Sequence, residues 1–185
     1  MSTKHSKAAA RFIGNRKQEA WHDETLWMVR VKRDKMSHSL PEWERLRELA
    51  CEIKLYSNSH LDVLLEEFEK NATANGAIVH WAKDAAEHNA IVEEILQQHK
   101  AHTLIKSKSM LTEECGMNDY LFGKGYDIIE SDLGERILQW MKLHPSHIVM
   151  PAIHIKRQEV GEMMERVLGT EKGNSDPTYL THAVR

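Results

Sequence analysis

The second half of the chain repeats a short apolar segment followed by an amphipathic stretch, and this alternation restricts the fold more than any other feature. Four such segments begin near Ile78, Thr103, Asp127 and His147, roughly 20 to 25 residues apart. After each one, apolar residues recur at the three- and four-residue spacing of a helix. Consecutive strand–helix–strand units give parallel strands with right-handed crossovers. The sequence therefore predicts an α/β fold with a parallel sheet over residues 73–185.

The first part of the chain, residues 1–72, follows a different pattern and is predicted to form a helical arm. Ser39 is expected to cap one of its helices, with Pro41 in the first turn. Exposed apolar stripes favour aggregation, so we expect the arm to pack on the α/β body or on a partner chain. The stripes consist of Trp43, Leu46, Leu49, Ala50 and Ile53, followed by Leu61, Leu64, Leu65 and Phe68.

Charge and hydropathy exclude several classes of protein. The net charge of −3 provides no general attraction to nucleic acid or to an anionic membrane. No apolar run approaches the roughly 20 residues that a membrane-spanning helix needs. We therefore expect a cytoplasmic protein with no nucleic-acid partner and no membrane span.

Metal-binding motifs are absent from the sequence. Cys51 and Cys115 are the only cysteines, and an iron–sulfur cluster usually needs four thiolates. The chain has 12 histidines, but none of them belongs to a recognised set of metal ligands. We therefore predict no metal site and no cofactor in this chain.

Polar residues follow three of the predicted strands, at the point where each strand ends. The carboxyl ends of parallel strands meet at one edge of a sheet, and ligands bind there. The sequence therefore predicts a ligand-binding edge, although no catalytic residue can be assigned. The candidate residues are Lys106, Lys108 and Ser109 after the second strand, Glu130 and Asp132 after the third, and His154 after the fourth.

Two interpretations of these residues remain open. The two lysines precede a helix N-terminus and could bind a small carboxylate or phosphate. In that case Lys106 and Lys108 would be surface residues that matter for binding and little for folding. Alternatively, Thr112 caps the helix and the lysines are solvated. Asp132 could likewise be a helix cap, and His154 could be a capping residue or one that supports the site.

Several segments together resemble one known family. They are "KSKSMLTEE", "ESDLGERI" and "PSHIVMPAIH", with "VHWAKDA" and "LPEWERLRELACEIK" upstream. These segments are similar to the lactate utilisation protein B family, whose members carry the LUD domain. The resemblance implies a fold similar to that of sugar-phosphate isomerases and coenzyme A transferases. It also implies a role in a multi-subunit system that oxidises L-lactate to pyruvate and passes electrons through iron–sulfur clusters.

Members of this family continue beyond the point where "DPTYLTHAVR" ends this chain. The resemblance thus implies an N-terminal LUD-type domain, incomplete at its C-terminal end and inactive alone, with 4Fe-4S clusters in the C-terminal part of the parent protein. Its implied role is small-anion binding or docking of other subunits of a lactate utilisation complex. Two alternatives are an enzyme domain of the coenzyme A transferase or sugar-phosphate type and a structural interaction module.

Overall fold

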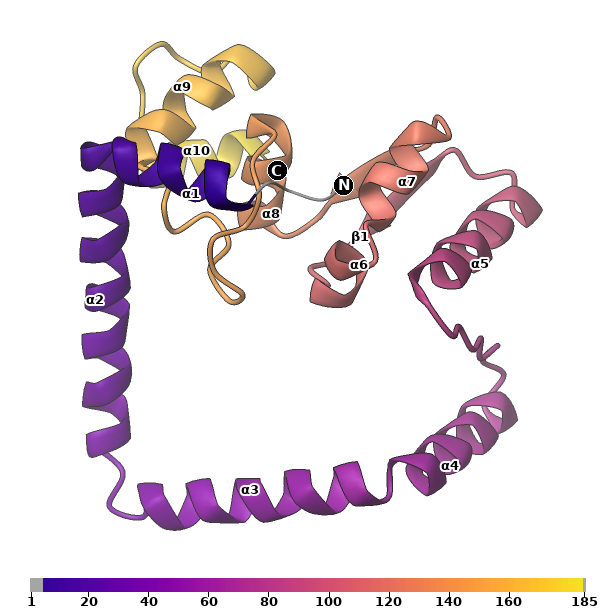
Figure 1. Cartoon of the computed structure of the whole chain (residues 1–185). Coiled ribbons are helices and arrows are strands. Elements are labelled where there is room, and N and C mark those ends of the chain that lie inside the picture. The colour runs from indigo at the N-terminus through magenta and orange to yellow at the C-terminus, as the bar shows by residue number, and fades with distance from the viewer. Residues whose placement is uncertain (1–4, 185) are drawn as a thin grey trace. The chain divides into compact units, whose positions relative to one another are not determined.

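The computed structural model describes residues 5–184 and places ten helices and two strands among them (Figure 1). Contacts between residues divide the chain into two units: Trp27–Lys83, and the residues up to Leu26 together with those from Asp84 onward. The elements are α1 (His5–Gly14), α2 (Arg16–His38), α3 (Trp43–Ser59), α4 (Leu61–Ala74), α5 (Ala85–Gln98), β1 (Thr103–Lys106), α6 (Met110–Glu114), α7 (Met117–Gly123), β2 (Asp127–Glu130), α8 (Leu133–Met141), α9 (Arg157–Leu168) and α10 (Pro177–Val184).

The unit Trp27–Lys83 is helical, as the apolar periodicity predicts, and its helices bury little. Neither α3 nor α4 contains a buried residue. The predicted Ser39 cap is wrong, because the Ser39 hydroxyl donates to the Met36 carbonyl at the end of α2. Glu42 occupies the N-cap of α3 instead and makes no capping hydrogen bond with its side chain. Among the described residues, no helix is long and apolar enough to span a membrane.

The other unit contains a parallel pair of strands, which confirms the α/β class and the second and third predicted strands. β1 and β2 pair in register from Thr103 opposite Asp127 to Lys106 opposite Glu130. A buried cluster next to this pair comprises Leu96, Met117, Leu121 and Ile128. A second cluster lies between α8, α9 and α10 and comprises Ile137, Met163, Met164 and Leu180, with Trp140 and Met141 packed against it. Met163 and Met164 are thus core residues, as their helical spacing predicts.

The first predicted strand, near Ile78, does not form. The described residues around it are assigned to no helix or strand, and the Ile78 side chain is 82% exposed. The apolar run satisfies the sequence criteria for a strand, but no neighbouring strand supplies its hydrogen bonds. The helix predicted to follow it does form, and the Asp84 carboxylate caps α5 by accepting the Glu87 backbone N–H.

The fourth predicted strand, near His147, is also absent, and a local interaction explains why. The His147 ring nitrogen Nδ1 accepts the backbone N–H groups of both Val149 and Met150, at 3.0 Å each. A strand would donate such groups to a neighbour, and side chains that capture them locally compete with sheet formation. Within the described residues the sheet therefore has two strands rather than four.

Candidate functional site

A buried ion pair joins the ends of the two strands. Lys106 and Glu130 are register partners, and Lys106 Nζ lies 2.5 Å from Glu130 Oε1. The two side chains are only 10% and 3% exposed. Lys106 Nζ also lies 3.9 Å from Glu113 Oε1. The charge of Lys106 is thus already balanced within the chain. The expectation that Lys106 is a surface residue is wrong, because the β1–β2 register places it directly against a buried carboxylate.

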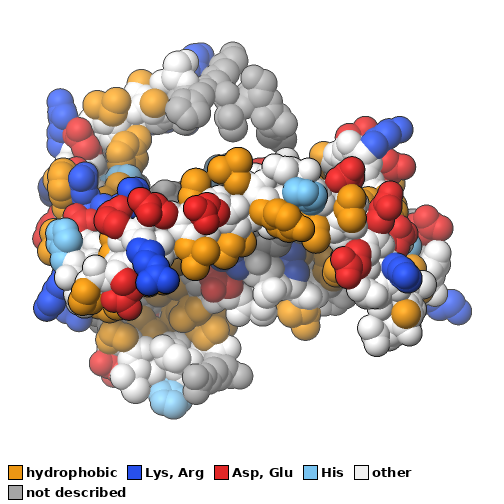
Figure 2. Space-filling model, turned by 90° about the horizontal axis from the view of Figure 1, so that it is seen from below, with side chains coloured by type: hydrophobic (Ala, Val, Ile, Leu, Met, Phe, Trp, Pro, Cys, Tyr) orange, Lys and Arg blue, Asp and Glu red, His pale blue; other side chains and the backbone are white. Residues whose placement is uncertain are grey.

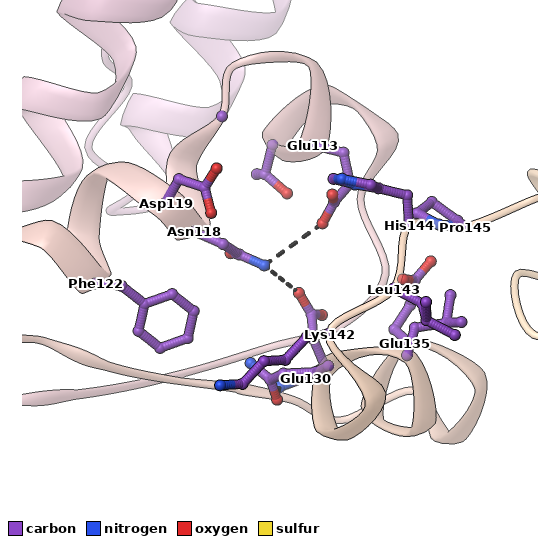
Figure 3. A pocket seen from close by; sticks show the side chains of 14 residues that line it. Glu113, Asn118, Asp119, Phe122, Glu130, Glu135, Lys142, Leu143, His144 and Pro145 are labelled. Atoms are coloured by element: carbon purple, nitrogen blue, oxygen red, sulfur yellow. Dashed lines mark hydrogen bonds between the residues drawn. The ribbon is translucent and has the colours of Figure 1, made fainter. Parts of the chain in front are cut away.

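Side chains from two helices hold Glu130 in place. Asn118 on α7 donates through Nδ2 to Glu130 Oε1 at 2.8 Å and to Glu113 Oε1 at 3.5 Å (Figure 3). Gln139 on α8 donates to the Ile128 carbonyl at 2.6 Å and accepts from the Glu130 backbone N–H at 3.5 Å. The end of β2 is therefore fixed from both sides.

A cavity of about 640 Å³ opens beside this network. Its walls come from α6, α7, the end of β2, α8 and the segment that follows α8 (Figure 3). The residues that line it are Thr112, Glu113, Gly116, Asn118, Asp119, Phe122, Glu130, Glu135, Leu138, Gln139, Lys142, Leu143, His144 and Pro145. Four of them carry carboxyl groups and only Lys142 carries an ammonium group, so acceptors outnumber cations in the lining.

Several buried polar atoms at the site have no hydrogen-bond partner among the described residues. Three of them are oxygens of residues that line the cavity: Glu130 Oε2, Glu135 Oε1 and Asn118 Oδ1. The fourth is Lys108 Nζ. Buried polar groups are nearly always paired, so a cluster of unpaired ones requires an explanation. Glu135 is 6% exposed, and burial raises the pKa of its carboxyl group. The carboxylates of Glu113 and Glu130 raise this pKa further, whereas the charge of Lys108 lowers it.

Helix capping accounts for two of the candidate residues. Ser109 is the N-cap of α6, and its Oγ accepts the Thr112 backbone N–H at 3.4 Å. The predicted Thr112 cap is wrong in detail, because the Thr112 hydroxyl donates to the Ser109 carbonyl instead. Asp132 caps α8 by accepting the Glu135 backbone N–H at 3.1 Å, which confirms the capping interpretation for this residue.

His154 is not among the residues that line the cavity. It is buried, and its Nδ1 lies 2.6 Å from the Ser146 hydroxyl. Burial lowers the pKa of its imidazole, and the nearby His22 lowers it further. The expectation that His154 would join the strand-end edge depended on a strand near His147 that does not form.

Sequence reasoning missed Asn118, Glu135 and Lys142. Glu135 stands three residues after Asp132, where it reads as an ordinary first-turn glutamate of a capped helix. Asn118 and Lys142 belong to no recognisable motif. They lie at the cavity because α7 packs against β2 and because α8 ends at Lys142 in a left-handed conformation, with φ 55°.

The thiols of this chain do not fit an iron–sulfur cluster. Cys51 is exposed on α3, and Cys115 lies between α6 and α7 in the other unit. Two thiols are half the usual ligand set of such a cluster. Over the range that the structure describes, no group of three or more His, Cys, Asp or Glu side chains is arranged to hold a metal ion.

Comparisons with known proteins place the chain in a family. Residues 65–180 match the model of the LUD domain. Lactate utilization protein B 1 of Bacillus mycoides is 38% identical over 159 residues, which cover 85% of this chain and 33% of that protein. Lactate utilization protein B of Bacillus pumilus is 40% identical over 151 residues, covering 80% of this chain and 32% of its own length.

A third relative carries a different name. The uncharacterized electron transport protein YkgF of Escherichia coli is 36% identical over 157 residues, covering 85% of this chain and 33% of YkgF. The chain thus spans about a third of the length of these relatives. No solved structure gives a significant match. The matched range contains the β1–β2 pair and the whole cavity, and we conclude that the chain belongs to the LUD domain family.

Proposed function

We propose that this chain is the LUD-domain part of an iron–sulfur protein that takes part in the oxidation of L-lactate to pyruvate, and that it serves there to dock other subunits for electron transfer. The names of its relatives support a role in lactate utilisation and electron transport. Because two thiols do not make a cluster site, the proposal assigns the 4Fe-4S clusters to a cysteine-rich part of the full-length protein.

The observation that carries the docking role is the exposed apolar surface of α3 and α4. Both helices repeat large apolar side chains at helical spacing, yet neither buries a residue. Exposed apolar patches of this kind mark interaction sites. Figure 2 shows such side chains in orange among charged ones. The exposed residues include Trp43, Leu46, Leu49, Ile53, Leu61, Val63, Leu64, Leu65 and Phe68.

The docking role can be tested with matched variants of α3 in the full-length protein. Leu49→Asp with Ile53→Asp places charge on the apolar stripe, whereas Glu48→Asp with Glu52→Asp changes neighbouring charged positions. We expect the first pair alone to abolish complex formation with co-expressed lactate utilisation proteins in size-exclusion chromatography. It should also stop growth on L-lactate in a strain that depends on the protein. Retention of the complex and of growth would contradict docking through α3.

A second candidate role is the binding of a small carboxylate or phosphate, and one observation favours it. Lys108 Nζ is buried and has no hydrogen-bond partner among the described residues, so its N–H groups can be donated to an anion, although its charge also acts on the Glu135 carboxyl group. Charge-assisted contacts of this kind contribute about 1.5–3 kcal/mol each. Lys108→Met should then weaken the binding of lactate, pyruvate or phosphate at least about tenfold in calorimetry. The exposed Lys172→Met should leave it unchanged, and equal affinities in both variants would exclude this role for Lys108.

A further inference from the structure

The cavity beside Glu130 has an unusual imbalance between hydrogen-bond donors and acceptors. Three buried atoms of its lining have no hydrogen-bond partner within the described part of the chain, and all three are acceptors: Glu130 Oε2, Glu135 Oε1 and Asn118 Oδ1. Asn118 already uses its Nδ2 group toward Glu130 and Glu113. An occupant that satisfies these three oxygens must therefore donate hydrogen bonds.

The charges of the cavity lining further limit the kind of group that can bind there. Glu130 and Glu135 are both more than nine-tenths buried, and Glu113 and Asp119 add two more carboxyl groups to the same lining. Two lysines offset part of this charge: Lys106 forms the ion pair with Glu130, and the charge of Lys108 lowers the pKa of Glu135. A buried carboxylate without a partner is costly, and a cation with several N–H groups relieves that cost best. A second anion in the cavity would increase it.

The arrangement also argues against a metal ion as the occupant. Within the part of the chain that is described, no three carboxyl, imidazole or thiol groups converge closely enough to coordinate one. An ammonium or guanidinium group imposes looser geometry, because its three or five donors can each reach a separate oxygen. The cavity volume of about 640 Å³ also leaves ample room for a side chain.

We infer that this cavity receives a primary ammonium or guanidinium group, and that its natural occupant is a lysine or arginine side chain of a docking subunit. Glu135 and the second oxygen of Glu130 accept its N–H groups at the cavity floor, and Asp119 and Glu113 contribute to the electrostatic attraction. The choice of a partner protein as the source rests on the docking role proposed above. The chemistry of the cavity does not depend on that role, and it can be tested on the protein alone.

The test uses small probes and nitrogen-15-labelled protein. Nα-acetyl-lysine amide and Nα-acetyl-arginine amide present the two cations, Nα-acetyl-norleucine amide presents an uncharged chain of similar length, and lactate presents an anion. We expect the two cationic probes to shift the Asn118 side-chain amide and Glu130 backbone signals in a saturable way, with dissociation constants on the order of millimolar. Norleucine amide should leave these signals unchanged.

Variants then locate the binding. Glu135→Gln keeps the shape of the side chain and removes its charge, and it should weaken binding of the cationic probes about tenfold. The exposed Glu162→Gln on α9 is the matched control and should have no effect. If Glu135→Gln fails to fold, Asp119→Asn at an exposed position of the lining should still weaken binding two- to threefold.

Three outcomes would overturn the inference. They are the absence of saturable shifts with either cation, equal binding of norleucine amide, and binding of lactate at the same signals with displacement of the cations. Failure of the docking role gives a different result. The probes would still bind, and Leu49→Asp with Ile53→Asp would leave complex formation intact. Release of an otherwise stable complex by Glu135→Gln would connect the two proposals.

Discussion

The strand-end region around β1 and β2 buries apolar and charged side chains, whereas the helices α3 and α4 leave their side chains exposed. The strand-end region buries a cluster that includes Leu121 and Ile128, and it even buries a charged pair, Lys106 and Glu130. α3 and α4 carry as clear an apolar stripe in their sequence but bury no residue. An apolar pattern therefore shows that a helix or strand can be buried. Burial itself, and the stability that it gives, require another surface to pack against.

Shortening an apolar side chain should give the largest difference in stability loss between the two regions. Leu121→Ala removes a fully buried side chain and should lower the free energy of unfolding by about 4 kcal/mol, through lost burial and the cavity left behind. Leu49→Ala on α3 should change it by no more than about 0.5 kcal/mol. Equilibrium urea unfolding measures both. A loss above about 2 kcal/mol for Leu49→Ala would show that the apolar stripe of α3 is already buried in solution, and that the two regions do not differ in burial.

Removal of a positive charge should give the next largest difference in stability loss between the two regions. Lys106→Met leaves Glu130 buried without its cation, and we expect a loss of about 3 kcal/mol in the free energy of unfolding. Arg47→Met breaks the exposed α3 pair with Glu44 and should cost less than about 0.5 kcal/mol. The same urea titrations apply. Equal, small losses in both variants would mean that water reaches Glu130 and that the strand-end pair behaves as a surface pair.

Loss of an N-cap residue should give the smallest difference in the free energy of unfolding between the two regions. Asp132→Ala removes a carboxylate that accepts the Glu135 backbone N–H, and it should lower the free energy of unfolding by about 1 kcal/mol. Glu42 holds the corresponding position of α3 without a side-chain hydrogen bond, so Glu42→Ala should cost no more than about 0.3 kcal/mol. Thermal unfolding followed by circular dichroism can rank the two. A reversed order would show that Glu42 stabilises the start of α3 more than Asp132 stabilises the start of α8.

The strands show how far sequence patterns alone could predict the fold. The apolar runs near Ile78 and His147 satisfy the same criteria as the runs that become β1 and β2. Nothing within these runs indicates that Ile78 lacks a neighbouring strand or that His147 captures the amides of its own segment. Strand formation depends on hydrogen bonds to residues far away in the sequence, so a local pattern identifies candidates without selecting among them.

The candidate site divides in the same way. Lys106 and Glu130 could be predicted as neighbours because parallel strands end at one edge, and the structure joins them. Both interpretations of the sequence, an anion-binding lysine and a solvated one, made Lys106 a surface residue, because no local signal reveals how deeply a strand end is buried. His154 was placed at this edge only through a strand that does not exist. Asn118 lies at the site because α7 packs against β2, and no sequence motif indicates that packing.

The sequence by itself determined the local features of this protein. Among these are the helical arm, the Asp84 and Asp132 caps and the buried Met163 and Met164, which depend on neighbours within one or two turns of helix. The tertiary structure alone decided which apolar runs pair as strands and which polar side chains share a cavity. The physical reason is that a sheet hydrogen bond, or a partner for a buried charge, must come from residues that only folding brings close.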